Sequence, residues 1–206
     1  MILWLSLLGC GAGPSVDPAG DLSVDLPDGE LSDLGDATAP DGQVGRDRHR
    51  MTVPQLADSI ERVTGLRWMD GDDDQFEEYS ASLGVPDWIE RTSENRTPDL
   101  VFNKLLDDAA ADICLELVDL ESMGGEHLLV GVTLSSTLET DRQAIEAALS
   151  RALLRFHGHN IPVGDDRLGG WTWLFESSVN VTSGDTHMAW RAVCTALLIH
   201  PDFYTY

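Results

Sequence analysis

Apolar residues recur at helical spacing in several stretches of the chain, with polar residues between them. The longest such stretch runs from residue 102 to residue 120, where apolar side chains return every three or four positions. Thr97, Pro98 and Asp99 come just before it and are typical of a helix start. The pattern predicts a long helix whose inward side chains are Phe102, Leu105, Leu106, Ala109, Ile113, Leu117 and Leu120.

Two more helices are predicted by capping residues at their starts and glycine at their ends. Thr52 is suited to cap a helix whose first turn accepts Pro54, and Gly65 is suited to end that helix. Thr140 begins a capping box that closes at position 143, and Gly158 ends the helix that follows. The inward positions are Leu56, Ile60 and Val63 in the first helix, and Ile145, Leu149, Ala152, Leu153 and Phe156 in the second.

The C-terminal part of the chain predicts a short helix near residues 171–175 and a final helix. The final helix begins at about Asp185 and ends before Pro201, with Met188, Ala192, Leu197 and Leu198 facing inward.

Residues 127–134 are β-branched and apolar and form a strand candidate, but a single strand cannot make a sheet. The fold class predicted is mainly α: a single helical domain of four to five helices over residues 46–206.

Residues 10–45 have no such periodicity. Positions 11–45 contain eight acidic residues and no basic or aromatic residue, and several prolines and glycines interrupt them. A segment of this kind cannot bury enough apolar surface to offset its ordering entropy, so we expect an acidic, disordered tether. A calcium-binding repeat is the alternative, but the irregular spacing of the aspartates favours a solvated linker.

An apolar run, Ile2 to Leu8, precedes Cys10 at the start of the chain. The segment Leu7-Leu8-Gly9-Cys10 resembles the lipobox of bacterial lipoproteins. The resemblance implies that residues 1–9 are a signal peptide and that the Cys10 thiol carries a diacylglycerol that attaches the protein to a membrane. Gly11, in place of aspartate, is similar to lipoproteins sent to the outer membrane. The alternative is an unprocessed apolar N-terminus, since no Lys or Arg precedes the run.

Charge excludes several classes of partner. Acidic residues outnumber Lys and Arg by 36 to 13, which gives a formal net charge of −23. Nucleic acids and anionic lipid surfaces are bound by basic faces, so neither is an expected partner of this chain. The sequence has no nucleophile elbow, phosphate-binding loop, dinucleotide fingerprint or His-Glu-x-x-His, and we predict neither catalysis nor a cofactor.

Cys114 and Cys194 each lie near the apolar stripe of a predicted helix. In an oxidising cell envelope they are able to form a disulfide that joins two helices 80 residues apart. The alternative is a pair of buried free thiols that act as small apolar side chains. The tryptophans, and the tail from Phe203 to Tyr206, are expected to be core residues and not a ligand platform.

Two groups of residues are candidate metal ligands. Asp70, Asp72 and Asp74 lie in an acidic knot that suits Ca²⁺, but the EF-hand pattern fails because Gln75 and Ala81 replace its glycine and its glutamate. His157 and His159 are close enough to share a zinc ion, which needs two further ligands. His187 and His200 lie on another predicted helix, and the sequence alone does not say whether they contact this pair. The alternatives are a solvated acidic loop and histidines that interact with the last carbonyls of a helix.

Parts of the domain resemble helical modules of large secreted planctomycete-type proteins of unknown function that accompany c-type cytochrome domains. Residues 50–65 resemble the opening helix of these proteins, and residues 148–158 their arginine-rich helix. Residues 190–206 are similar to their closing helix and its Pro-x-Phe terminal element. The resemblance implies a secreted envelope protein and a haem-containing neighbour. The chain itself has no Cys-x-x-Cys-His, so the resemblance implies no haem ligand here.

These observations predict a lipid-anchored, non-enzymatic protein of the bacterial outer membrane that presents its domain to a protein partner. A role as an accessory to a cytochrome-associated system follows from the resemblance alone. The alternative function is that of a secreted metal-binding module or a metal-dependent enzyme that uses the aspartate knot or the histidine pair.

Overall fold

Helix α1 (Val53–Thr64) shows how closely the local sequence sets an element of this fold. Thr52 caps it: the Thr52 side-chain oxygen accepts the Gln55 N–H, and the Gln55 side chain accepts the Thr52 N–H in return. Gly65, with φ of +76°, ends the helix in the left-handed conformation that favours glycine. Leu56 and Ile60 are buried as predicted. The computed structural model describes residues 49–89, 92–124 and 127–206, so the predictions for residues 1–45, including Cys10, lie outside it.

Helix α3 (Leu100–Glu121) begins where Asp99 accepts a hydrogen bond from the Phe102 N–H at 2.8 Å. Most of its predicted inward residues are buried. Leu105 is only partly buried, and Leu120 is exposed over 46% of its surface. At this end of the helix the buried positions are Leu117, Val118 and Glu121, so Leu120 falls outside the buried stripe.

Helix α4 (Leu138–His157) starts earlier than predicted, after Thr137. The capping box assigned to Thr140 is therefore wrong as the start of the helix. The backbone of Asp141 leaves the helical region (φ −130°, ψ 28°), which marks a kink between the first turn and the body of the helix. All the predicted inward residues of the body are buried, and Gly158 ends the helix with φ of +70°.

The C-terminal elements are the short 3₁₀ helix η2 (Asp166–Leu168) and helices α5 (Gly169–Val181), α6 (Thr186–Ile199) and α7 (Pro201–Tyr204). Asp185 caps α6 by accepting the Met188 N–H at 3.2 Å. Met188 itself is 38% exposed, and Ala192 is only partly buried, so their predicted inward placement is wrong. The buried face of α6 lies one residue further along, at Ala189, Trp190, Val193, Cys194, Leu197 and Leu198.

The strand candidate at residues 127–134 is wrong, because the described part of this segment forms turns. The carboxylate of Glu121, which is only 4% exposed, accepts the backbone N–H groups of His127, Leu128 and Leu129. A side chain thus satisfies the donors that a neighbouring strand would have paired. Two very short strands form elsewhere: β1 (Met69–Asp70) pairs antiparallel with β2 (Asp73–Asp74), just before helix α2 (Gln75–Glu78).

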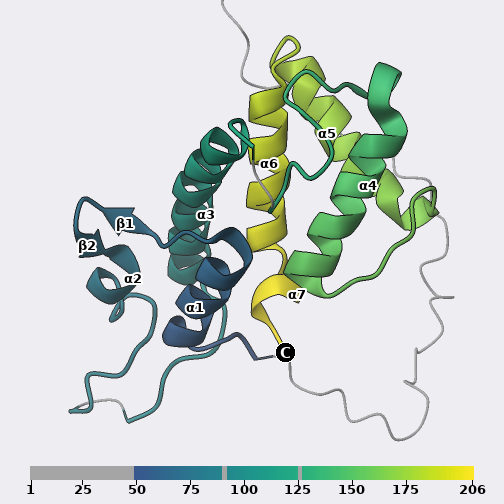
Figure 1. Ribbon diagram of the computed structural model, residues 1–206. Coiled ribbons are helices and arrows are strands. Elements are labelled where there is room, and N and C mark those ends of the chain that lie inside the picture. Colours follow the sequence, from purple (N-terminus) through teal and green to yellow (C-terminus); the bar gives the residue numbers. More distant parts are fainter. Residues whose placement is uncertain (1–48, 90–91, 125–126) are drawn as a thin grey trace, which may run out of the picture. The chain divides into compact units, whose positions relative to one another are not determined.

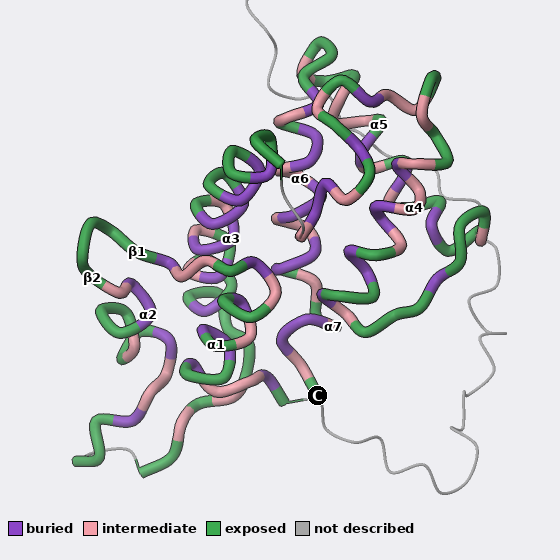
Figure 2. The backbone as a smooth tube through the Cα atoms, viewed as in Figure 1, coloured by how far each residue is buried: buried purple, intermediate pink, exposed green. Residues whose placement is uncertain are grey.

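Helix α6 is the central element of the domain. It packs against α3 on one side and against α5 and α4 on the other, while α1 lies beside α3 (Figure 1). The buried positions of these helices turn toward one another, with exposed positions on the outer faces (Figure 2). The prediction of a mainly α domain is therefore confirmed for residues 49–206 as described.

The C-terminal tail docks on the domain, as predicted. Phe203 and Tyr204 are buried, and the Tyr204 carbonyl accepts the Met51 N–H at 2.7 Å. His49 and Tyr206 exchange two backbone hydrogen bonds of 3.3 and 3.1 Å. The first and last described segments of the chain thus lie side by side.

None of the described helices is both long enough and apolar enough to cross a membrane.

Candidate functional site

A buried arginine holds the two ends of a long loop. The side chain of Arg50 is 1% exposed, and its Nη2 donates to the carbonyl oxygens of Leu83 (2.5 Å) and Asn95. Its Nη1 donates to the carboxylate of Glu94 at 3.1 Å. The guanidinium also lies over the ring of Phe102, 4.6 Å from the ring centroid. Arg50 therefore ties residues 83 and 94–95 to the start of α3.

Glu94 and Gly84 make two further contacts that hold the ends of this loop in place. Glu94 also accepts the Val53 N–H at 2.9 Å, so its carboxylate joins the loop to the first turn of α1. Gly84 has φ of +94°, and a Cβ at this position would lie 3.0 Å from both Arg50 Nη2 and the Asn95 carbonyl oxygen. Glycine is thus required here both by the backbone angle and by the close approach of the guanidinium. We call Arg50, Gly84, Glu94 and Asn95 the loop clamp.

The loop held by the clamp exposes two large apolar side chains. Trp88 is 71% exposed and Ile89 is 90% exposed. Trp88 has φ of +63°, a conformation that is uncommon for a residue with a bulky side chain. The prediction that the tryptophans are core residues is correct for Trp68 and Trp190 but wrong for Trp88 and for Trp173, which is 67% exposed.

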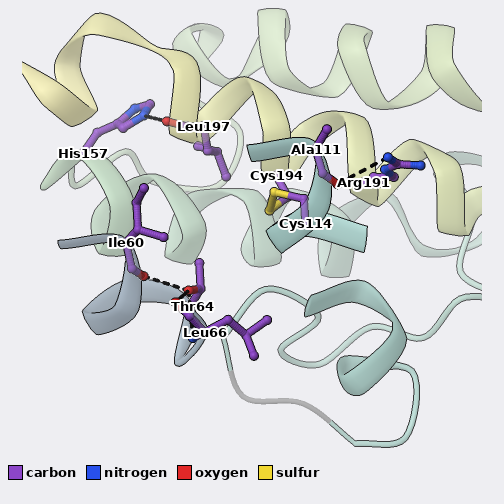
Figure 3. Close-up of a disulfide and its surroundings, with 9 residues drawn as sticks. All are labelled: Ile60, Thr64, Leu66, Ala111, Cys114, His157, Arg191, Cys194 and Leu197. Carbon is purple, nitrogen blue, oxygen red and sulfur yellow. Dashed lines mark hydrogen bonds between the residues drawn. A yellow bond between two sulfur atoms is a disulfide. The ribbon is translucent and has the colours of Figure 1, made fainter. Parts of the chain in front are cut away.

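The predicted disulfide between Cys114 and Cys194 is confirmed (Figure 3). It joins the middle of α3 to α6, with the two Cα atoms 5.7 Å apart, and both residues are fully buried. Nearby, Arg191 Nη2 donates to the carbonyl oxygen of Ala111 at 3.3 Å, which makes a second link between the same helices (Figure 3). The disulfide is structural, since no surface of it is open to solvent.

The aspartate knot forms the β1–β2 hairpin. Asp70 and Asp72 are exposed, with Asp72 in the turn that Gly71 allows through its φ of +62°. Asp74 has a structural role: its Oδ1 accepts the Phe76 N–H at 2.8 Å at the start of α2, and its carboxylate is paired with Arg67. The three carboxylates therefore do not converge on one point: Asp70 and Asp72 face solvent, and Asp74 caps α2 and pairs with Arg67.

The histidine pair has a neighbour that the sequence did not predict. His157 lies 4.8 Å from His200 and 5.8 Å from His159, measured between ring centroids. His157 Nε2 bonds the carbonyl oxygen of Leu197 at 2.9 Å (Figure 3), and because a carbonyl only accepts, this nitrogen carries the proton. His187 lies apart, against Asp119. Among the described residues, no three or more His, Cys, Asp or Glu side chains are arranged to hold a metal ion.

We expect acid to destabilise the domain through His157. Its pKa is lowered mainly by burial, and the neighbouring His200 and His159 lower it further, against the effects of the Leu197 hydrogen bond and of Asp202. As the pH falls below about 6.5, the unfolded imidazole takes up a proton before the folded one does, so stability decreases. Urea midpoints measured from pH 7.5 to pH 5.5 should fall in the wild type. The fall should be smaller in His157→Gln, whose amide can still donate to Leu197; equal falls in both proteins would contradict the assignment.

The fold and its features define an all-α domain, closed by one buried disulfide, that presents a clamped loop with an exposed tryptophan. Comparison of the chain with protein-family models, with curated proteins and with solved structures finds no match. The resemblance to the planctomycete-type modules therefore stays a prediction made from the sequence.

Proposed function

We propose that this protein is a lipid-anchored, non-enzymatic component of the bacterial outer membrane whose helical domain binds a protein partner. In this proposal the lipidated Cys10 provides the anchor and the acidic segment 10–45 provides the tether. The loop held by the clamp makes the contact with the partner, through Trp88 and Ile89. The single observation that carries the binding role is the exposed Trp88 on this loop.

The clamped loop costs free energy to form. Burying the Arg50–Glu94 pair requires desolvation of two charges, and the left-handed Trp88 adds backbone strain. The strain at Trp88 is not needed to fill the core, because the side chains of Trp88 and Ile89 are exposed to solvent. Exposed tryptophans on a preorganised frame are the residues that contribute most to protein–protein affinity. The arrangement therefore favours a contact surface over a passive loop.

The anchor and the class of partner come from the sequence. The lipobox-like segment that ends at Cys10 supports an envelope location, and the planctomycete-type resemblance supports a partner from a haem-containing system. The formal net charge of −23 favours a partner with a neutral or basic face.

Capture from detergent-extracted native envelopes tests the anchor and the loop separately. Cys10→Ser should move the chain out of the membrane fraction. Trp88→Asn should leave it in the membrane but lower recovery of the partner by about tenfold, because a central tryptophan contributes on that scale. Asparagine is chosen because it tolerates a positive φ and so preserves the backbone.

Trp173→Gln is the matched control, since it removes another exposed tryptophan on α5, away from the loop. It should leave partner recovery unchanged. A companion protein recovered equally well with Trp88→Asn would refute the role of the loop. A Cys10→Ser chain that stays in the membrane fraction would refute the anchor while leaving the binding role intact.

A further inference from the structure

An open cavity of about 520 Å³ lies between the β1–β2 hairpin and α3, away from the clamped loop. Its walls combine aromatic and acidic residues. The lining residues are Trp68, Met69, Asp70, Gln75, Tyr79, Leu105, Asp108 and Asp112. The hairpin and α3 face each other in Figure 1, which shows how segments distant in the sequence meet here.

The aromatic wall is preformed. The rings of Trp68 and Tyr79 stack with centroids 5.7 Å apart and an interplanar angle of 29°. Trp68 Nε1 donates to Asp112 Oδ2 at 3.0 Å, which fixes the indole, and Tyr79 remains 36% exposed. Trp68 is only 5% exposed, so a cation that enters the cavity meets mainly the ring of Tyr79, which its stack on the fixed indole holds in place.

The acidic wall comes from two elements. Asp108 and Asp112 are four residues apart on α3, so their carboxylates lie on one face of the helix, and Asp70 faces the same cavity from the hairpin. Lys104 pairs with Asp108, but this pair is exposed on both sides and is worth little. The three carboxylates therefore give the cavity a negative potential.

The amide of a mostly buried glutamine adds a further polar group. Gln75 lines the cavity and is 7% exposed. Its amide nitrogen donates to Glu78 Oε2 at 3.1 Å and to the Asp73 carbonyl at 3.4 Å. No donor among the described residues reaches its amide oxygen. The buried side-chain atoms without a partner in the described residues are Arg50 Nε and Trp190 Nε1, so the Gln75 amide oxygen is reached by solvent and is able to accept a hydrogen bond from a ligand.

We propose that this cavity binds the guanidinium group of an arginine side chain presented by another polypeptide. A guanidinium is flat enough to stack on the aromatic wall, and its five N–H donors suit three carboxylates and one amide oxygen better than the three donors of an ammonium. A metal ion is a poorer fit, because no three donor side chains among the described residues are arranged around one point. The proposal does not rest on the function proposed above, because it uses neither Cys10 nor Trp88.

NMR titration of the full chain, carrying Cys10→Ser and labelled with ¹⁵N, tests the site. The ligands are three capped tripeptides, Gly-Arg-Gly, Gly-Lys-Gly and Gly-citrulline-Gly; citrulline has the shape of arginine without its charge. The indole N–H signal of Trp68 reports binding, because the indole is hydrogen-bonded to Asp112 in the cavity wall. Loss of one indole signal in Trp68→Phe assigns it.

The arginine peptide should shift this signal saturably and bind tighter than the lysine peptide, and the citrulline peptide should produce no saturable shift. Asp108→Asn should weaken arginine binding about threefold, on the scale of an exposed charge pair. Asp107→Asn is the matched control, because it removes the same charge from the neighbouring exposed position outside the cavity, and it should leave the affinity unchanged. Equal responses to arginine and citrulline, tighter binding of lysine, or equal effects of the two aspartate variants would each overturn the proposal.

Discussion

Replacing Arg50 by methionine is expected to lower the free energy of unfolding by about 3–5 kcal/mol, because it removes one partner of a buried ion pair. The carbonyl oxygens of Leu83 and Asn95 lose their donor, and the carboxylate of Glu94 loses its counter-ion. Methionine fills much of the same volume, so the loss reports the polar contacts more than a cavity. Urea unfolding at pH 7 measures the effect.

Arg142→Met is the control for this change. Arg142 is 58% exposed and pairs with Glu146 one turn along α4, an interaction worth about 0.3–0.5 kcal/mol. A loss of similar size in the two variants would show that the clamp contributes no more than a surface ion pair.

Removal of the Cys114–Cys194 disulfide is the second large effect expected. The bond closes a separation of 80 residues, which on the chain-entropy model corresponds to about 4–5 kcal/mol of stability. We expect the double variant Cys114→Ala/Cys194→Ala to unfold at a much lower urea concentration than the wild type. Alanine is preferred to serine because both positions are fully buried, where a hydroxyl would need a partner.

Reduction of the wild-type chain gives the matched comparison without a change of sequence. Unfolding in urea with excess reductant should show a similar loss of stability, since both treatments lift the same constraint on the unfolded chain. In the absence of urea the buried sulfurs should resist the same reductant. If the oxidised and reduced chains unfold at the same urea concentration, the disulfide does not contribute to stability.

The helices follow from short-range rules. The caps at Thr52, Asp99 and Asp185 each depend on residues within one turn, so the sequence shows them directly. The predicted start of α4 is wrong because a first helical turn follows Thr137 without a side-chain cap, and the sequence does not show this turn or the kink at Asp141 that separates it from the body of the helix. The strand candidate at 127–134 failed because a side chain of α3, Glu121, supplies the partners of its backbone.

The burial of both cysteines was predictable because they lie near the apolar stripes of two predicted helices. The choice between a disulfide and two buried free thiols depends on the packing of α3 against α6, which brings the two Cα atoms within 5.7 Å. The loop clamp was not predictable, since Arg50 and Glu94 are 44 residues apart and neither lies in a periodic segment. The cavity between the β1–β2 hairpin and α3 has one signal in the sequence: Asp108 and Asp112 share a helix face by their spacing alone. Their position opposite Trp68 depends on how the hairpin packs, which no local pattern encodes.

The pairing of His49 with Tyr206 has a consequence for how this fold can be joined to other chains. The backbones of residues 49 and 206 are hydrogen-bonded to each other, so the two ends of the domain lie next to each other. The domain is therefore suited to insertion into a surface loop of another protein, because both connections to that protein would be made at the same place. For the same reason a short peptide can connect residue 206 to residue 49, and new ends can then be opened at an exposed turn. In such a circular permutant every helix keeps its neighbours, and only the order in which the chain visits them changes.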